Sequence, residues 1–167
     1  TVTQASLYVQ NWIAITNQVQ ERTVNISEAN HGGSTVTLRS ADPAMIRLST
    51  AGGPIADSVI IFVPDGTTSG PFTLHGQPNA YGTTSVIASS PFLTLDTATM
   101  RVRTAGIEFI ALDTLHPEQG GASPVSLRRG FLTADSSQVE LPAVVLNYAP
   151  VVTATVTSSV PTVVGMK

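Results

Sequence analysis

The 167-residue chain contains no cysteine, and only 11% of its residues are charged, against about 25% in a typical domain. The absence of cysteine excludes disulfides, thiolate metal sites and cysteine nucleophiles. The net charge is −3, and the eight Lys and Arg residues are scattered along the chain. Such a chain lacks the basic patch that binds nucleic acid or anionic lipid, so we predict no nucleic-acid partner.

Long apolar runs and helical periodicity are also missing. The longest apolar run, VIIFV at 59–63, is far shorter than the roughly 18 residues that cross a bilayer, so we predict no membrane insertion. Thr, Val, Ser, Gly and Pro interrupt nearly every window in which a helix could form. The length suffices for one large domain or up to two small ones with self-sufficient cores.

Short alternating segments make up most of the chain instead. TVTLR at 35–39 places its Val and Leu on one face, and TATMRVRT at 97–104 does the same with Ala, Met and Val. Each segment ends at turn residues rich in Gly and Pro. This pattern predicts an all-β protein built as an antiparallel β-sandwich. The other strands are expected at 6–12, 23–27, 45–49, 58–64, 71–76 and 83–89.

The order of these segments resembles a known family. STVTLRSADPAMIRLS (34–49), SVIIFVPDGTTSGPFTLHG (58–76) and GTTSVIASS (82–90), followed by TATMRV (97–102), are similar to the bacterial immunoglobulin-like repeats of large secreted and surface-exposed proteins. The resemblance implies an immunoglobulin-like (Ig-like) β-sandwich over residues 1–103. It also implies an extracellular or cell-surface location and a non-catalytic structural or adhesive role.

A second module is indicated by a repeated opening. The segment at 152–164 aligns with 34–46, and the segment at 101–112 precedes it as 7–15 precedes the first copy. We therefore predict a second, shorter or incomplete β module at 104–167.

Three explanations for the short second module stay open. The chain is a fragment of a longer repeat array, or it contains a smaller divergent sandwich, or a neighbouring subunit completes a half-module by strand addition. This module pairs either with the first module or with a neighbouring subunit. Val152, Ala154 and Val156 are the predicted apolar row of an inter-subunit or inter-module strand.

The sequence offers no catalytic constellation. His31, His75 and His116 form no H-x-H or H-E-x-x-H unit, and no G-x-S-x-G motif is present. We predict no enzyme activity, no catalytic residue, no cofactor and no metal ligand.

The carboxylates lie where turns and strand ends are expected. Asp57 and Asp65 are interpreted in this way, as are Glu108 and Asp113. Glu108, Asp113 and Glu118 also surround the expected module junction, but they form no D-x-D-x-D-G loop. Calcium binding at the junction therefore stays an open alternative to a purely structural role.

Aromatic residues are the remaining indication of a ligand. In a single strand over 6–12, Tyr8 and Trp12 share one face, either as a stacking platform for sugars or as part of the core. Tyr81 is expected at a loop tip. Trp12 and Tyr81 are therefore the candidate contact residues for a cell-surface glycan.

Three functions follow from these observations. The first is a structural or adhesive building block whose partners are neighbouring modules. The second is a filament subunit joined to identical subunits by β-strand exchange, and the third is a glycan-binding adhesin domain.

Overall fold

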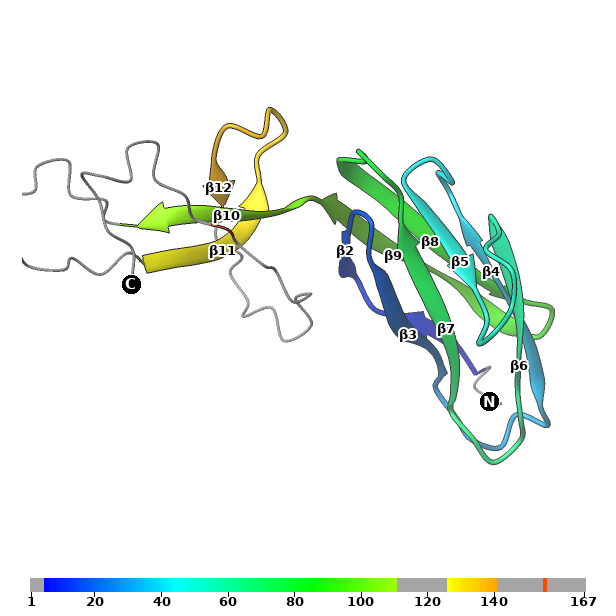
Figure 1. The fold of residues 1–167 in the computed structure, drawn as a ribbon. Helices are drawn as coiled ribbons and strands as arrows, with labels where there is room; N and C mark the ends of the chain where they lie inside the picture. Colours follow the sequence, from blue (N-terminus) through cyan, green and yellow to red (C-terminus); the bar gives the residue numbers. More distant parts are fainter. Residues whose placement is uncertain (1–4, 111–125, 141–154, 156–167) are drawn as a thin grey trace, which may run out of the picture.

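The computed structural model describes residues 5–110, 126–140 and 155, and every regular element in these ranges is a β-strand (Figure 1). Nine strands form two sheets, and a further three form a small separate sheet. The nine are β1 (Leu7–Val9), β2 (Trp12–Ile15), β3 (Val19–Ile26), β4 (Ser34–Ser40), β5 (Ile46–Ser49), β6 (Ser58–Val63), β7 (Ser69–Gly76), β8 (Gly82–Ser90) and β9 (Leu93–Arg103). The other three are β10 (Ala105–Ile110), β11 (Ser126–Leu132) and β12 (Val139–Glu140).

The two larger sheets pack face to face as a sandwich (Figure 1). Their strand orders are β1-β3-β7-β5 and β2-β9-β8-β4-β6. In the Ig pattern one sheet has the order A-B-E-D and the other contains G-F-C, extended in some members by C′. The observed orders match this pattern with β4 as C and β6 as C′, which confirms the predicted Ig-like β-sandwich. One departure is that β5, in the D position, comes before β6 along the chain.

One strand pair also departs from the predicted antiparallel arrangement. β2 pairs with β9 in parallel, while the other strand pairs of the described sheets are antiparallel. A parallel pair joins strands that are far apart in sequence, and here β2 comes near the start of the sandwich and β9 at its end. The first and last parts of the sandwich therefore meet in one sheet.

Alternation along the strands builds the core as predicted. In β4, Val36 and Leu38 are fully buried, and in β9, Ala98, Met100 and Val102 are buried as a row on one face. A period of two residues puts such a row on one side of the pleat. Apolar residues of the opposite sheet, including β3 and β7, complete the core between the two layers.

The prediction for the first strand is wrong in one respect. Residues 6–12 do not form a single strand, because β1 ends at Val9 in one sheet and β2 begins at Trp12 in the other. Alternation assigns faces only within a continuous strand. Tyr8 is 54% exposed, whereas Trp12 packs against the core, so the two rings do not share a face.

The separate sheet begins immediately after the sandwich. β10 pairs antiparallel with β11, from Ala105 opposite Phe131 to Ile110 opposite Ser126, and β12 extends the sheet. The change of sheet falls at Thr104, where the sequence predicts the second module to start. Val152, Ala154 and Val156 lie outside the described residues, so the predicted inter-subunit strand stays a prediction. No helix in the described part of the chain is long and apolar enough to span a membrane.

Candidate functional site

Residues 5–16 lie alongside β9, the last strand of the sandwich, over most of its length. Near the start of β9, the Thr94 N–H donates a hydrogen bond to the Ala5 carbonyl at 3.4 Å. Further along, the Val9 N–H donates to the Asp96 Oδ2 at 2.7 Å. This segment therefore contacts β9 before the parallel strand pair begins.

The parallel pairing continues this contact to the end of β9. Asn11 Oδ1 accepts a hydrogen bond from the Thr99 N–H at 2.7 Å. β2 then pairs with β9 from Trp12 opposite Met100 to Ile15 opposite Arg103. Beyond β2, the Thr16 N–H donates to the Arg103 carbonyl at 3.0 Å. The segment at 5–16 and β9 are thus joined at both ends and along the middle.

A glycine in β7 allows β2 to pass close to the opposite sheet. A Cβ added at Gly76 would lie 2.1 Å from the Ile15 carbonyl oxygen. The Gly76 N–H donates to the Gln18 carbonyl, and its own carbonyl accepts from the Asn17 N–H, each at 3.0 Å. The backbone of Gly76 therefore lies closer to Ile15 than any residue with a Cβ could, and its two hydrogen bonds hold the turn that follows β2.

Thr104 connects the sandwich to the small sheet as a single residue between β9 and β10. Its carbonyl accepts a hydrogen bond from the Leu132 N–H of β11 at 2.9 Å. Its hydroxyl lies 3.2 Å from the Thr16 hydroxyl, at the end of the β2 segment. The connection is therefore tied both to the sandwich and to the sheet that follows.

Arg103 and Tyr81 pack against each other beside this connection. The Arg103 guanidinium carbon lies 4.5 Å from the centre of the Tyr81 ring, which places the cation over the aromatic face. Its Nη1 donates to the Gly82 carbonyl at 2.9 Å and to the Val102 carbonyl at 2.8 Å. The predicted contact residue Tyr81 is half-buried and serves as a support for Arg103 in this structure. Its binding of a glycan stays a prediction.

Trp12, the other predicted contact residue, is half-buried in the same sandwich. Its ring lies 6.1 Å from the Phe72 ring at an angle of 59°, and the Arg22 guanidinium carbon lies 5.1 Å from its centre. These contacts agree with the alternative in which Trp12 packs on the core. No sequence pattern links Trp12 to Tyr81, and the structure places each of them beside a different arginine.

His31 and His75, the two histidines within the described residues, have different hydrogen-bond partners. His31 Nε2 is 2.9 Å from the Thr67 carbonyl oxygen. His75 Nε2 is 2.8 Å from the Ser49 hydroxyl, and burial lowers the pKa of His75. Within the described residues no three His, Asp or Glu side chains come together as a metal site. His116 lies outside those residues.

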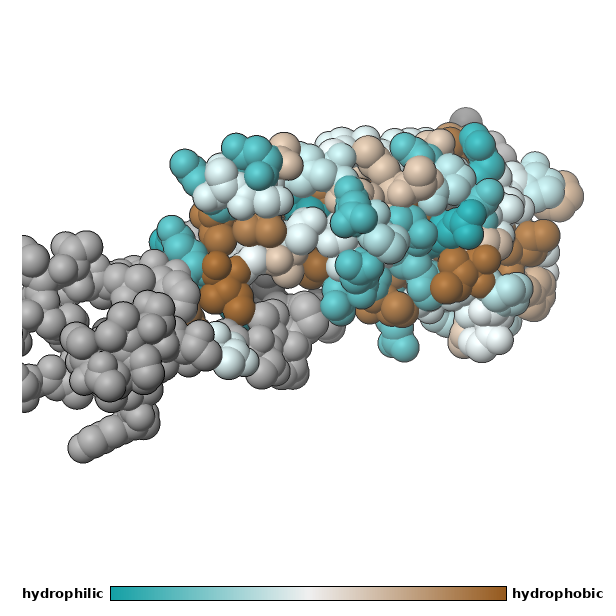
Figure 2. Space-filling model, turned by 45° about the horizontal axis from the view of Figure 1, so that its top comes forward, coloured by the Kyte–Doolittle hydropathy of each residue, from teal (hydrophilic) through white to brown (hydrophobic). Residues whose placement is uncertain are grey.

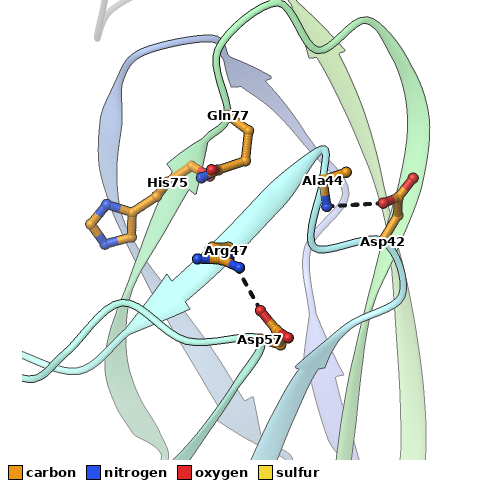
Figure 3. A network of polar contacts seen from close by, with 6 residues as sticks. All are labelled: Asp42, Ala44, Arg47, Asp57, His75 and Gln77. Carbon is orange, nitrogen blue, oxygen red and sulfur yellow. Dashed lines mark hydrogen bonds and ion pairs between the residues drawn. The ribbon is translucent and has the colours of Figure 1, made fainter.

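Asp57 and Asp65 occupy the approach to a strand and a turn, as the sequence predicts. The same prediction is wrong for Glu108, which lies inside β10, because its side chain pairs with a residue of the neighbouring strand. Asp57 immediately precedes β6, and its Oδ1 lies 3.4 Å from the Arg47 Nε (Figure 3). The Asp42 Oδ1 accepts a hydrogen bond from the Ala44 N–H at 3.0 Å. Asp65 accepts from the Gly32 N–H at 2.7 Å. Asp57 and Asp65 therefore hold local structure.

The expected junction carboxylates are only partly described. Glu108 forms an ion pair with Arg128 across the β10–β11 pair. Asp113 and Glu118 lie outside the described residues, so calcium binding there stays untested. The small sheet also has a hollow of about 190 Å³ beside Glu108, lined further by Ile107, Leu132 and Val139. Its volume is below the about 300–1,000 Å³ of ordinary ligand pockets.

Besides the β2–β9 attachment, the edge strand β6 is a candidate interaction surface. It is the last strand of its sheet, and its outward-facing Ile60 and Phe62 are 67% and 65% exposed. Apolar side chains also break the mostly polar surface of the sandwich in the space-filling view (Figure 2). The VIIFV run carries an apolar residue at every position, and this signal in the sequence indicates a strand that is apolar on both faces. The parallel β2–β9 pairing has no comparable signal.

Comparisons with known proteins give distant structural likenesses. No protein-family model and no curated protein matches the chain. The crystal structure of the RIG-5 IG1 homodimer is 13% identical with a TM-score of 0.36, and the alignment covers 60% of this chain and 99% of that one. A structure of titin kinase and its flanking domains gives 7% identity and a TM-score of 0.35, over 62% of this chain and 17% of that one.

The M1 domain from titin gives 9% identity and a TM-score of 0.32, over 60% of this chain and 91% of that one. The Ig-like assignment of the sandwich rests on its own strand order, described above.

Proposed function

We propose that the chain is a non-catalytic, load-bearing building block of a bacterial surface or secreted protein. Its partners are neighbouring modules of the same array. The resemblance to bacterial Ig-like repeats and the hydroxyl-rich, weakly charged surface support the extracellular location. The observation that carries the proposal is the parallel attachment of residues 5–16 to β9.

The direction of this attachment determines how the sandwich responds to tension. The chain enters the sandwich through residues 5–16 and leaves it at the C-terminal end of β9. In a parallel pair these two ends point in opposite directions, so tension slides the strands past each other. The inter-strand hydrogen bonds are then loaded together, whereas a hairpin pulled at its open end breaks them one after another.

The junction transmits load in the same direction. Only Thr104 separates β9 from β10, and hydrogen bonds tie it to Thr16 and Leu132. Arg103 is the last residue of β9, and its side chain is held by the Tyr81 ring and by two carbonyl groups. A short junction with several attachments suits a spacer better than a freely hinged linker does.

Single-molecule force spectroscopy tests the proposal. Because the sequence has no cysteine, cysteines introduced at Ala5 and Thr104 are unique handles that load the parallel pair. Handles at Asn17 and Thr104 leave residues 5–16 outside the load path and serve as the matched control. Unfolding between the first pair of handles should lengthen the chain by roughly 30 nm.

We expect a clearly higher unfolding force for the Ala5 and Thr104 handles than for the control at the same loading rate. Equal forces in the two geometries would contradict a load-bearing role for the parallel pair. The filament alternative predicts instead that either the incomplete C-terminal copy or the N-terminal strand is donated to a neighbour. Of these two segments, the N-terminal strand lies within the described residues, and its Leu7–Val9 pair with β3 of their own chain.

A further inference from the structure

We propose that β6 is a docking edge for a second copy of this chain, which adds its own β6 antiparallel to the first. This inference does not depend on the proposed load-bearing role. It rests on the direction of the main-chain groups of β6, on its side chains and on the charges around it.

The main-chain groups of β6 divide between β4 and the free edge. The Ser40 N–H donates to the Asp57 carbonyl at 2.9 Å, so residue 57 faces β4. Successive residues of a strand direct these groups to opposite sides, so residues 59, 61 and 63 also face β4. Ser58, Ile60 and Phe62 therefore direct their N–H and C=O groups away from β4. No strand among the described residues pairs on that side of β6.

This edge lacks the features that usually protect an edge strand. Natural edges carry Lys, Pro, inward-facing charges or a bulge to prevent pairing with another chain. β6 has the sequence SVIIFV without charge or proline, and its pairing with β4 runs without a register shift. Its outward face carries two large exposed apolar side chains, Ile60 and Phe62. An unprotected edge of this kind favours β-strand addition.

The strand is self-complementary in one register. When Ile60 faces Ile60 of the second copy, Ser58 faces Phe62 at both ends, so the smallest outward side chain lies opposite the largest. The residues that face each other are the ones whose main-chain groups point outward, as an antiparallel ladder requires. A shift by two residues in one direction places Asp57 opposite Asp65 and Pro64 opposite Ser58, which is unfavourable. A shift by two residues in the other direction places Phe62 opposite Ala56, whose main-chain groups are already bonded to Leu48.

Arg39 adds an attractive contact between the copies. It lies on β4 directly beside Ser58 and is exposed. In the proposed register, Phe62 of the second copy lies on the far side of Ser58, within reach of a long side chain. A guanidinium over an aromatic ring is favourable. Arg39 has no ion pair within the described residues, so the contact does not break an existing one.

Sedimentation velocity of the full chain, over about 1 to 200 µM, tests the proposal, because a small edge interface is at the weak end of specific complexes. We expect a monomer–dimer equilibrium. Ile60→Lys should weaken it by more than about tenfold, because two lysines would face each other across the axis. Val19→Lys is the matched control, since Val19 is 63% exposed on the other sheet, and this variant should dimerise normally.

Two further measurements separate this interface from general stickiness. Arg39→Ala should weaken the dimer about two- to fivefold, while Arg101→Ala, at an exposed position on β9, should not. Dimerisation should persist in 1 M NaCl because no ion pair crosses the axis. Trp12 fluorescence, unchanged in Ile60→Lys, shows that this variant folds. A chain that stays monomeric throughout, a dimer that Ile60→Lys leaves intact, or equal loss in Ile60→Lys and Val19→Lys overturns the proposal.

Discussion

Gly76→Ala should strongly destabilise the sandwich, because the added methyl group would occupy backbone space. The new Cβ would lie 2.1 Å from the Ile15 oxygen, 2.7 Å from the Ile15 carbonyl carbon and 3.2 Å from the Thr16 Cα. To reach an ordinary contact, the end of β2 must move by roughly 1 Å, and overpacking of this kind costs about 1–3 kcal/mol. No flexible side chain is available to give way.

The same movement strains the two hydrogen bonds that Gly76 forms with Asn17 and Gln18, each worth about 1 kcal/mol. Against this, replacing glycine by alanine reduces the conformational entropy of the unfolded chain, which stabilises the folded state by about 0.4–1 kcal/mol. The net loss should be about 2–4 kcal/mol, which lowers the Tm by at least about 10 °C in a domain of this size.

Urea and thermal unfolding followed by Trp12 fluorescence measure this loss. Trp12 is the single tryptophan of the chain and lies in the sandwich, so the signal reports the sandwich alone. Gly52→Ala is the control, because Gly52 has a φ of +70° and no atom within 4 Å of an added Cβ. Its cost comes from backbone conformation alone, about 1–2 kcal/mol. A Gly76→Ala variant as stable as the wild type would refute the close approach of β2 and β7.

Two predictions concern pH. Burial lowers the pKa of His75 below its ordinary 6.5, so the unfolded chain binds this proton more tightly than the folded chain does. The contribution of His75 to the free energy of unfolding is therefore complete above pH 6.5 and decreases as the pH falls below it. Urea unfolding of the wild type and His75→Gln at pH 7.5 and 5 should show this difference. Hydrogen bonds from the Thr133 hydroxyl, and then from Ser137, lower the pKa of Asp135 from 3.8 to about 2. The Asp135 contribution is therefore present above pH 3.8 and is lost as the pH falls towards 2. NMR titration should show a midpoint near 2 for this carboxyl and a higher value in Thr133→Val, and an unchanged midpoint in that variant would contradict the assigned hydrogen bond.

The sequence predicted most of the sandwich because the alternation within each strand shows which of its residues face the core. In β4 and β9, alternation of apolar and hydroxyl side chains identifies both the strand and its buried face. The same reasoning failed at residues 6–12, where the chain leaves one sheet after Val9 and joins the other at Trp12. Such a change is determined by packing against distant strands, which a local pattern does not record.

The candidate sites were less predictable for the same reason. Tyr81 was identified as an aromatic at a loop, but its partner Arg103 is remote in sequence, and their contact depends on the pairing of β8 with β9. The parallel attachment of residues 5–16 depends on closure of the whole sandwich. By contrast, the apolar character of both faces of β6 is visible in VIIFV itself, because no polar residue alternates with the apolar ones.

The two proposed roles use opposite edges of one sheet. In the order β2-β9-β8-β4-β6, the load-bearing strand β2 lies at one edge and the docking strand β6 at the other. Three strands separate them, so a second copy on β6 would leave the β2–β9 pair unobstructed. Side-by-side association of chains is therefore compatible with tension along each of them. The Ile60→Lys variant should accordingly lose the dimer and keep the unfolding force of the wild type, because its side chain points to solvent and contributes nothing to the parallel pair.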